Sequence, residues 1–174
     1  MSRINYDLKE IRGVVFDVDG VLSPATVPMS PEGVPMRMAN LKDGYALQLA
    51  VKRGLKIAII TGADVPSIPG RFNVIGIKDI FMGVSDKLPV FVSWLKENGL
   101  DPREVAYVGD DIPDLPVMHA CGLPVSPRDG AIEARMVAGF VTSANGGYGV
   151  ARELIEEILK ARGQWLSDSS AYAW

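Results

Sequence analysis

The stretch Val14-Val15-Phe16-Asp17-Val18-Asp19-Gly20-Val21-Leu22 joins a short apolar run to two carboxylates that stand two residues apart. The apolar run is typical of a buried strand, and the glycine after it indicates a loop. Two like charges at this spacing raise each other's pKa unless a cation or a proton relieves them. We therefore interpret Asp17 and Asp19 as a metal site, an acid–base pair or both, and a strand-end aspartate can also act as a nucleophile. For an Asp-x-Asp tripeptide alone, a turn or a helix cap is the alternative.

Three other polar signals lie beside apolar stretches further along the chain. Residues 57–60 run into Thr61-Gly62, residues 105–108 run into Gly109-Asp110-Asp111, and Lys87 precedes a helical pattern. An open parallel sheet binds its ligands at the carboxyl ends of its strands, so we expect these side chains to meet the first two aspartates in one crevice. Taken singly, each has a structural alternative: a strand-to-loop turn, a solvated surface lysine, and a helix start in which Asp114 favours the helix dipole.

Strand and helix signals alternate through the chain, which predicts a three-layer α/β/α fold with a parallel, Rossmann-like sheet. Apolar residues recur with helical spacing from Leu88 to Leu95, and Asn98-Gly99 supplies a stop. A second apolar stripe predicts a helix from about Gly149 to Arg162. The expected strands are Gly13–Asp17, Lys56–Thr61, Ile80–Gly83, Val105–Asp110, Leu123–Val125 and Phe140–Thr142.

Composition restricts the class of protein. The chain has 174 residues, 48% hydrophobic and 22% charged, so we assign residues 1–174 to a single domain with a sizeable core. A net charge of −3 without a basic block argues against nucleic-acid binding and a membrane-surface role. Cys121 and His119 are the only residues of their types, which excludes an intrachain disulfide and leaves little for a multi-histidine zinc site. The single cysteine leads us to expect a cytoplasmic protein. From the polar start, and from the lack of an apolar run near the roughly 20 residues of a spanning helix, we expect neither a signal peptide nor a transmembrane helix.

The motifs together resemble a known superfamily. Their order matches that of the haloacid dehalogenase-like (HAD-like) phosphohydrolases: Asp17-Val18-Asp19-Gly20, Ile60-Thr61-Gly62, Lys87, and Gly109-Asp110-Asp111 followed by Asp114. Within that superfamily the chain is most similar to a small capless branch, the 3-deoxy-D-manno-octulosonate 8-phosphate phosphatases. The segments that carry this likeness are residues 17–22, Asp43-Gly44-Tyr45-Ala46, Ser85-Asp86-Lys87, residues 109–118 and Gly146-Gly147-x-Gly149-x-x-Arg152-Glu153. The chain departs from the branch at Ser23-Pro24-Ala25, where the branch has Thr-Asp-Gly, and at Ala63, where the branch has Arg.

The resemblance implies a Mg²⁺-dependent phosphatase of lipopolysaccharide biosynthesis that hydrolyses a 2-keto-3-deoxy sugar acid phosphate through an aspartyl phosphate. It also implies a homotetramer in which a neighbouring subunit completes the active site. Three alternatives stay open: a phosphatase for the nine-carbon sugar acid 9-phosphate, a broader sugar phosphatase, and a catalytically silent assembly or regulatory module. A phosphoryl mutase would need a cap to retain its intermediate, and the chain has no segment long enough for one.

The chemistry of phosphoryl transfer assigns a role to each motif residue. Mg²⁺ prefers about six oxygen ligands, so we assign Asp17 as nucleophile and ligand, the Asp19 backbone carbonyl as a ligand, and Asp110 as the third protein ligand. We expect Asp111 and Asp114 to act behind these ligands or through water. The Asp19 side chain, pointing away from the metal, is expected to protonate the leaving oxygen and later to deprotonate the attacking water.

The remaining assignments concern the phosphate and the sugar. Thr61 is expected to donate its hydroxyl to a phosphate oxygen, and Lys87 to neutralise the nucleophile and the phosphoryl group in the transition state. An acidic sugar also needs a cation for its carboxylate, and Arg71 could supply the charge missing at Ala63. The candidate substrate-binding residues are Gly62, Arg71, Lys42, Arg37 and Arg152.

Two segments interrupt the strand–helix pattern. Residues 23–41, which we call the proline-rich insert, contain four prolines and three methionines around a Pro31-Glu32-Gly33 turn signal. We predict a β-hairpin whose apolar side chains pack on another subunit, with a loose surface loop as the alternative. Residues 164–174 form a tail with three aromatic side chains. We expect this tail to pack on a neighbouring subunit near the substrate mouth, as in the resembled branch.

Overall fold

The computed structural model describes residues 4–173, and its centre is a six-stranded sheet in which every neighbouring pair is parallel. The strand order is β3-β2-β1-β4-β5-β6. Strand β1 therefore lies in the middle of the sheet, and its Phe16 is opposite Ile59 on one side and Val108 on the other. The strands are β1 (Gly13–Phe16), β2 (Lys56–Ile60), β3 (Asp79–Phe81), β4 (Val105–Val108), β5 (Leu123–Ser126) and β6 (Phe140–Val141).

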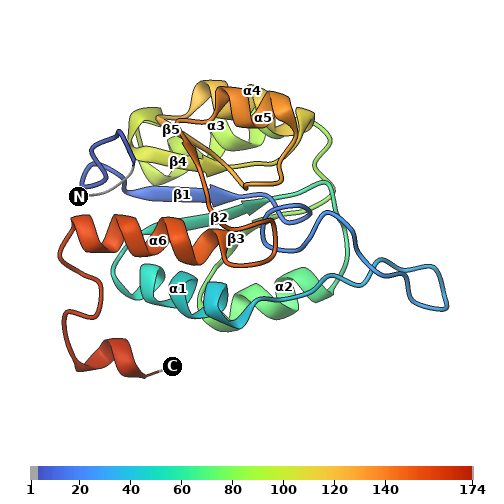
Figure 1. The fold of residues 1–174 in the computed structure, drawn as a ribbon, viewed down its shortest axis with the longest axis horizontal. Helices are drawn as coiled ribbons and strands as arrows, with labels where there is room; N and C mark the ends of the chain where they lie inside the picture. The colour runs from blue at the N-terminus through green and yellow to red at the C-terminus, as the bar shows by residue number, and fades with distance from the viewer. Residues whose placement is uncertain (1–3, 174) are drawn as a thin grey trace.

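Helices cover both faces of this sheet, which gives the three layers that Figure 1 shows. One face carries α1 (Leu41–Lys52), α2 (Ser67–Phe72) and α6 (Val150–Ala161), and the other carries α3 (Lys87–Asn98), α4 (Leu115–Ala120) and α5 (Ile132–Val137). Short 3₁₀ turns are η1 (Asn73–Ile75), η2 (Pro102–Glu104), η3 (Ile112–Asp114) and η4 (Ser169–Tyr172).

Strand β1 contributes to two hydrophobic cores because successive side chains point to opposite faces of a strand. Val14 and Phe16 belong to the core beneath α1 and α6, whereas Val15 belongs to the core that holds Phe91 and Trp94 of α3. All three strand residues are fully buried. A strand buried on both faces reads as a continuous apolar run, which is why the first motif could be recognised from the sequence.

The predicted fold class is confirmed, and all six predicted strands are present with ends within two residues of the predicted ones. The sequence places the end of the first strand at Asp17, one residue too far. The ladder nevertheless extends to that residue, because the Asp17 N–H donates to the Val108 carbonyl at 3.0 Å. Helix α3 ends where predicted, at Gly99, whose φ of +61° is the left-handed conformation that glycine adopts at helix ends.

The proline-rich insert projects from the edge of the molecule at the carboxyl ends of the strands (Figure 1). It turns back on itself as a hairpin would, but its described residues contain no strand, only isolated bridges: an antiparallel one between Met29 and Pro35, and a parallel one from Ser23 to Asp19. Hydrogen bonds from Ser30 N–H to Val34 O and from Met36 N–H to Pro28 O close the loop at 2.9 and 2.8 Å. Proline has no N–H to donate, so the segment cannot build a regular ladder.

The tail lies against its own chain in the structure, on α1 and α6. The Trp165 ring packs edge-to-face on Tyr45 with centroids 6.0 Å apart, and the Arg152 guanidinium lies 4.7 Å above the Trp165 ring. The last turn, η4, lies at the end of the molecule opposite the insert (Figure 1). The Trp165 side chain therefore contacts helices of its own chain. The predicted contact of the tail with a second subunit stays a prediction, and Trp174 lies outside the described residues.

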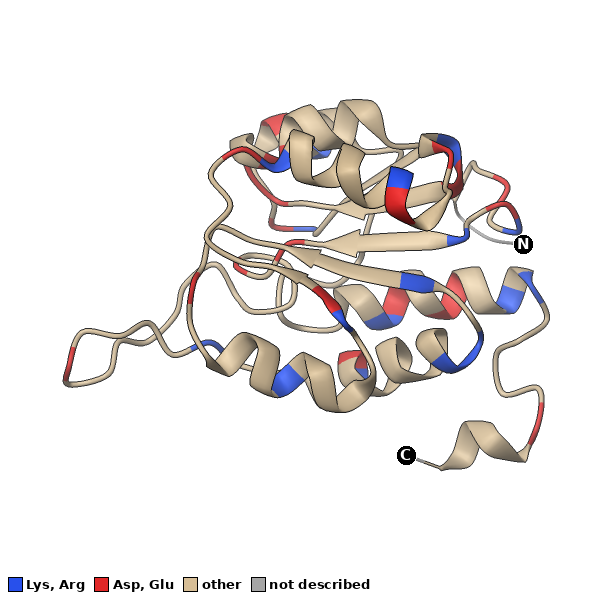
Figure 2. Ribbon diagram, turned by 180° about the vertical axis from the view of Figure 1, so that it is seen from behind, with Lys and Arg blue, Asp and Glu red and all other residues tan. Residues whose placement is uncertain are grey.

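Charged residues of both signs are mixed on the helices of both layers (Figure 2). Among the helices of residues 4–173, none has both the length and the apolar character needed to span a bilayer.

Candidate active site

The carboxyl ends of β1 and β4 bring the first and last motifs into contact. Asp17 follows β1 directly, and Asp110 follows β4 after one glycine. The loop after β1 turns at Gly20, whose φ of +80° favours glycine. A Cβ atom at Gly20 would overlap the Asp110 carboxylate, so that side chain lies directly on the Gly20 backbone. Glycine is therefore required here for both its conformation and the close approach.

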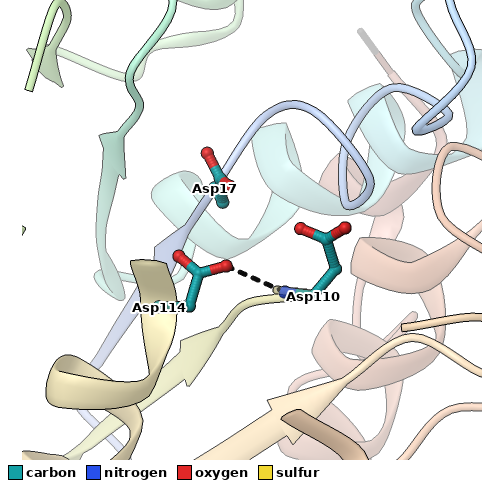
Figure 3. A group of neighbouring side chains, drawn as sticks. All are labelled: Asp17, Asp110 and Asp114. Carbon is teal, nitrogen blue, oxygen red and sulfur yellow. Dashed lines mark hydrogen bonds between the residues drawn. The ribbon is translucent and has the colours of Figure 1, made fainter. Parts of the chain in front are cut away.

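Three carboxylates form the centre of the site (Figure 3). Asp17, Asp110 and Asp114 each offer an oxygen within 4.8 Å of the others. Burial, and next the charge of Asp114, raise the pKa of Asp17 to about 6, although Lys87 opposes this shift. Burial, and next the charges of Asp17 and Asp114, raise the pKa of Asp110 to about 8. The three carboxylates of this cluster thus carry more negative charge than the ammonium group of Lys87 neutralises.

Asp114 connects the cluster to its surroundings by accepting four hydrogen bonds. Its Oδ1 accepts from Lys87 Nζ and from the Tyr107 hydroxyl, both at 2.7 Å. Its Oδ2 accepts from the backbone N–H groups of Asp110 at 2.9 Å, the bond drawn in Figure 3, and of Asp111 at 3.3 Å. Four donors occupy the four lone-pair positions of one carboxylate, so Asp114 has none left for an ion. Asp17 and Asp110 remain as the carboxylates that can face a ligand.

Lys87 is the first residue of α3, and its side chain is only 5% exposed. Its Nζ lies 2.9 Å from Asp17 Oδ2 and 2.7 Å from Asp114 Oδ1. Burial alone would lower the pKa of Lys87, but the charges of these two aspartates outweigh it and the pKa is raised. The helix begins where it does because Asp86 caps it, accepting from the Leu88 N–H. The cap thus places a cation beside the strand end of β1.

A cleft of about 430 Å³ opens over the cluster. Thr61, which is buried at the end of β2, lines this cleft, and its hydroxyl oxygen accepts from the Ala63 N–H at 3.2 Å. The hydroxyl hydrogen stays available for a ligand oxygen. The predicted residues that line the cleft are Asp17, Asp19, Thr61, Gly62, Lys87, Asp110, Asp111 and Asp114.

Asp19 lines the cleft, but its carboxylate is not part of the cluster of three. Both of its oxygens accept from Arg37, with Oδ1 2.9 Å from Nε and Oδ2 2.8 Å from Nη2. Arg37 comes from the proline-rich insert, so the structure joins a predicted substrate-binding residue to the predicted acid–base group. The Asp19 carboxylate is therefore held by the insert, and its role as acid and base stays a prediction.

Four of the five predicted substrate-binding residues do not line the cleft of this chain: Arg37, described above, and Arg71, Arg152 and Lys42. Arg71 on α2 lies against Gly44 of α1, where its Nη2 is buried and has no hydrogen-bond partner among the described residues. Arg152 pairs with Glu156 at 2.8 Å besides stacking on the tail. Lys42 is exposed in the first turn of α1. The sequence shows these charges but does not show which layer each helix joins, so their placement could not be predicted.

Tyr107 is a site residue that the sequence interpretation missed. It is fully buried in β4, and its hydroxyl holds Asp114 in place. Burial, and next the charge of Asp114, raise its pKa well above the usual value, so the hydroxyl keeps its proton and remains a donor. The only signal in the sequence was a hydroxyl group within the apolar run Val105-Ala106-Tyr107-Val108.

The donor set fits Mg²⁺. Carboxylate oxygens are the ligands that this hard cation prefers, and a site bound by one or two carboxylates and several waters is typical of it. Asp110 supports this fit, because its carboxylate accepts no hydrogen bond from the described residues although it is partly buried and crowded by like charges. A divalent cation would relieve that crowding.

Comparison with known proteins places the chain in a family, although no protein-family model matches it. The 3-deoxy-D-manno-octulosonate 8-phosphate phosphatase KdsC of Escherichia coli K12 is 36% identical over 156 residues, which cover 90% of this chain and 83% of that protein. The Moraxella catarrhalis phosphatase of the same name, solved in complex with a magnesium ion, a phosphate ion and a KDO molecule, superposes with a TM-score of 0.85 at 35% identity and covers 89% of each chain. A Legionella pneumophila protein described as a HAD superfamily (subfamily III A) hydrolase superposes with a TM-score of 0.90 at 32% identity, over 95% of this chain and 91% of that chain. This chain therefore belongs to the 3-deoxy-D-manno-octulosonate 8-phosphate phosphatase family of HAD-like hydrolases.

Proposed function

We propose that this protein is a Mg²⁺-dependent phosphomonoesterase for a 2-keto-3-deoxy sugar acid phosphate, namely 3-deoxy-D-manno-octulosonate 8-phosphate. One observation carries the proposal: the nucleophile candidate Asp17, the ligand candidate Asp110 and the cation of Lys87 converge at the carboxyl ends of neighbouring strands. The family supports the substrate, since its members are named for this sugar acid phosphate.

Bound Mg²⁺, held by Asp17, Asp110 and the Asp19 backbone carbonyl, would screen the negative charges of the nucleophile and of the phosphate. In the first step, an oxygen of Asp17 bonds to phosphorus while the bond from phosphorus to the sugar oxygen breaks. The proton that the sugar oxygen needs comes from the Asp19 carboxyl group. The products are the free sugar acid, an aspartyl phosphate on Asp17 and an Asp19 carboxylate.

The second step restores the enzyme. The Asp19 carboxylate takes a proton from water, whose oxygen attacks phosphorus while the bond to Asp17 breaks, and inorganic phosphate leaves. Lys87 stays beside Asp17 in both steps and stabilises the charge that moves on and off this oxygen. The Thr61 hydroxyl donates to a phosphate oxygen, and Asp111 and Asp114 hold the loop after β4.

Two observations bear on the alternatives. A silent assembly or regulatory module has no physical need for a buried lysine between two aspartates, since burying such charges costs free energy. The nine-carbon sugar acid 9-phosphate differs from the proposed substrate away from the phosphate, and the cluster described above holds only the phosphate end. We therefore keep the nine-carbon phosphatase as the second candidate, to be separated by turnover on the two substrates.

The assembly and the compartment are also proposals. The proline-rich insert exposes about half of the surface of Met29, Val34, Met36 and Met38. Apolar surface of this kind on a projecting segment supports contact with another subunit, and with the family resemblance it favours a homotetramer whose neighbours complete the site. We infer a cytoplasmic location from the single unpaired cysteine.

The test is a screen of phosphorylated sugar acids, of eight and nine carbons, with Mg²⁺ and with EDTA. We expect turnover that requires Mg²⁺ and is fastest with 3-deoxy-D-manno-octulosonate 8-phosphate. Asp17→Asn should lose at least about 10³-fold in kcat because the nucleophile is removed, whereas Asp7→Asn, which changes an exposed carboxylate outside the cleft, should retain full activity. Turnover that survives in EDTA or in Asp17→Asn would overturn the proposal.

A further inference from the structure

We infer that Arg37 is a positioning residue for Asp19, and that the proline-rich insert delivers this arginine to the acid–base group. The inference rests on the proposed function and extends it, because it gives the insert a role within its own chain. Neither the apolar character of the insert nor its predicted contact with other subunits requires an ion pair with the first motif.

The contact between Arg37 and Asp19 is a bidentate ion pair. A guanidinium fork holds both oxygens of one carboxylate at 2.9 and 2.8 Å, which fixes the orientation of the carboxylate plane as well as its position. The Arg37 side chain is 12% exposed, whereas the Asp19 side chain is 40% exposed. The arginine is therefore the fixed partner, and without it the aspartate would be free to change rotamer at the cleft wall.

The backbone of the insert is anchored on both sides of Arg37. The Met36 N–H donates to Pro28 O at 2.8 Å, and the Met38 N–H donates to the Ser23 hydroxyl oxygen at 3.2 Å. Ser23 is 1% exposed and forms a parallel bridge with Asp19. The insert thus leaves the first motif at Ser23 and returns to the same residue fifteen positions later, which places Arg37 beside the carboxylate that precedes the insert.

The pairing also determines how Asp19 can act. Each oxygen of Asp19 accepts one hydrogen bond from Arg37 and keeps a second lone-pair position, which can hold the proton that the leaving sugar oxygen needs. The fork fixes the plane of the carboxyl group, so this position stays directed at the leaving oxygen in the first step. After the proton has gone to the sugar, the carboxylate keeps both hydrogen bonds and is ready to take a proton from water.

This role differs from direct binding of the substrate carboxylate. Arg37 does not line the cleft, and its fork is already occupied by an acid of the protein. A substrate-binding arginine would matter only for substrates with a carboxylate. An arginine that positions the general acid matters for every substrate whose leaving oxygen must be protonated, with or without a carboxylate.

The experiment compares kcat/KM of the wild type and of Arg37→Ala on three Mg²⁺-supported substrates. These are the sugar acid phosphate found in the screen, glucose 6-phosphate, which has no carboxylate, and p-nitrophenyl phosphate, whose leaving group is a stable anion that needs no proton. Because kcat/KM reports the steps through formation of the aspartyl phosphate, we expect a fall of about tenfold or more with both sugar phosphates and a change of less than about twofold with the aryl phosphate.

Each other pattern would overturn the inference. A loss confined to the sugar acid phosphate would make Arg37 a substrate ligand, equal losses on all three would indicate a damaged site, and no loss would show that Asp19 is positioned without it. Arg37→Lys keeps the charge but not the fork, so it should recover only part of the rate, and complete recovery would also overturn the inference. Thermal unfolding with Mg²⁺ verifies that the variants are folded.

Arg12→Ala is the matched control. Arg12 pairs with Glu104 at 3.2 Å just before β1, at the other end of this strand from the cleft, and its side chain is 58% exposed. We expect this variant to behave as the wild type on all three substrates. If the wild type itself turns over no sugar acid phosphate in the screen, it is the proposed function that fails, whereas an active wild type with unaffected Arg37 variants refutes only the role of Arg37.

Discussion

Asp110 is the carboxylate of the site whose pKa is raised most clearly by its surroundings. Burial, and next the charges of Asp17 and Asp114, raise its pKa to about 8. We predict that Asp110→Asn abolishes the rise in melting temperature that Mg²⁺ produces in the wild type, because a ligand stabilises only the state that binds it. In EDTA at pH 9 the variant should be more stable than the wild type by at least about 1 kcal/mol, because the asparagine carries no charge to repel its neighbours.

Thermal unfolding with and without Mg²⁺ measures both effects. Asp64→Asn is the control, because Asp64 is an exposed carboxylate in the loop after β2 that does not line the cleft. A Mg²⁺ response that persists in Asp110→Asn would contradict the assignment of this residue as a ligand.

Asp43 gives a second prediction at the scale of one residue. It is 3% exposed on α1, and its Oδ1 accepts from the Arg152 N–H at 2.7 Å. A residue of α1 therefore caps the first turn of α6, whose own cap position is a glycine without a side chain, while the Asp43 Oδ2 has no hydrogen-bond partner among the described residues. Burial raises the pKa of Asp43 to about 6, and the hydrogen bond from Arg152 opposes this rise.

A carboxyl group with a raised folded-state pKa stabilises the fold fully below its unfolded pKa, and this contribution is lost as pH rises through the folded pKa. Between pH 4 and pH 7 the contribution of Asp43 should therefore fall by up to about 3 kcal/mol. We predict that the unfolding free energy of Asp43→Asn, measured relative to the wild type by urea denaturation, increases over this interval by up to that amount. A difference that stays constant with pH would show that the pKa of Asp43 is the same in the folded and unfolded states.

At the scale of elements, the tail and the two helices beneath it form one unit. Trp165 packs on Tyr45, and Ala171, which is 1% exposed, receives the Tyr45 hydroxyl on its carbonyl oxygen. Asp168 adds an ion pair with Arg53 at 2.8 Å. We predict that Trp165→Ala lowers the unfolding free energy by about 2 kcal/mol, through lost apolar burial and lost ring contacts, with no change in kcat.

Tyr172→Ala is the matched control in the same tail, because the Tyr172 side chain is 77% exposed. It should leave stability within about 0.5 kcal/mol of the wild type. An increase in KM on loss of Trp165 would instead favour the predicted contact of the tail with a neighbouring active site.

The predictions that succeeded at this scale depended on local signals. The Asn98-Gly99 stop ended α3 where expected, because the left-handed turn is a property of the glycine itself. The structure of the insert was harder to predict from local signals. A hairpin needs a ladder of backbone hydrogen bonds, and the prolines of the insert have no N–H groups to donate to one.

At the scale of the whole molecule, the exposed apolar surface of the proline-rich insert leads to a prediction about assembly. The insert projects away from the sheet (Figure 1), and its methionines are exposed, so charge placed on them should oppose subunit contact without disturbing either core. We predict that the double variant Met29→Asp and Met36→Asp has a lower mass than the wild type in sedimentation velocity. Val92→Asp, which changes an equally exposed apolar residue on α3, should leave the mass unchanged. Equal mass for the wild type and the double variant would contradict assembly through the insert.

The amino-acid sequence by itself determined the layered fold and the edge at which the chemistry gathers. Apolar runs specify buried parallel strands, and the residue that follows each strand must then lie at the carboxyl edge, so Asp17, Thr61 and Asp110 were predictable from their positions in the chain. Only the tertiary structure decided which hydrogen-bond donors from other elements reach each buried or site carboxylate. The hydrogen bonds from Lys87 and Tyr107 to Asp114, the fork of Arg37 on Asp19 and the cap that Asp43 supplies to α6 follow no short-range spacing rule, because each depends on how elements that form separately come to pack together.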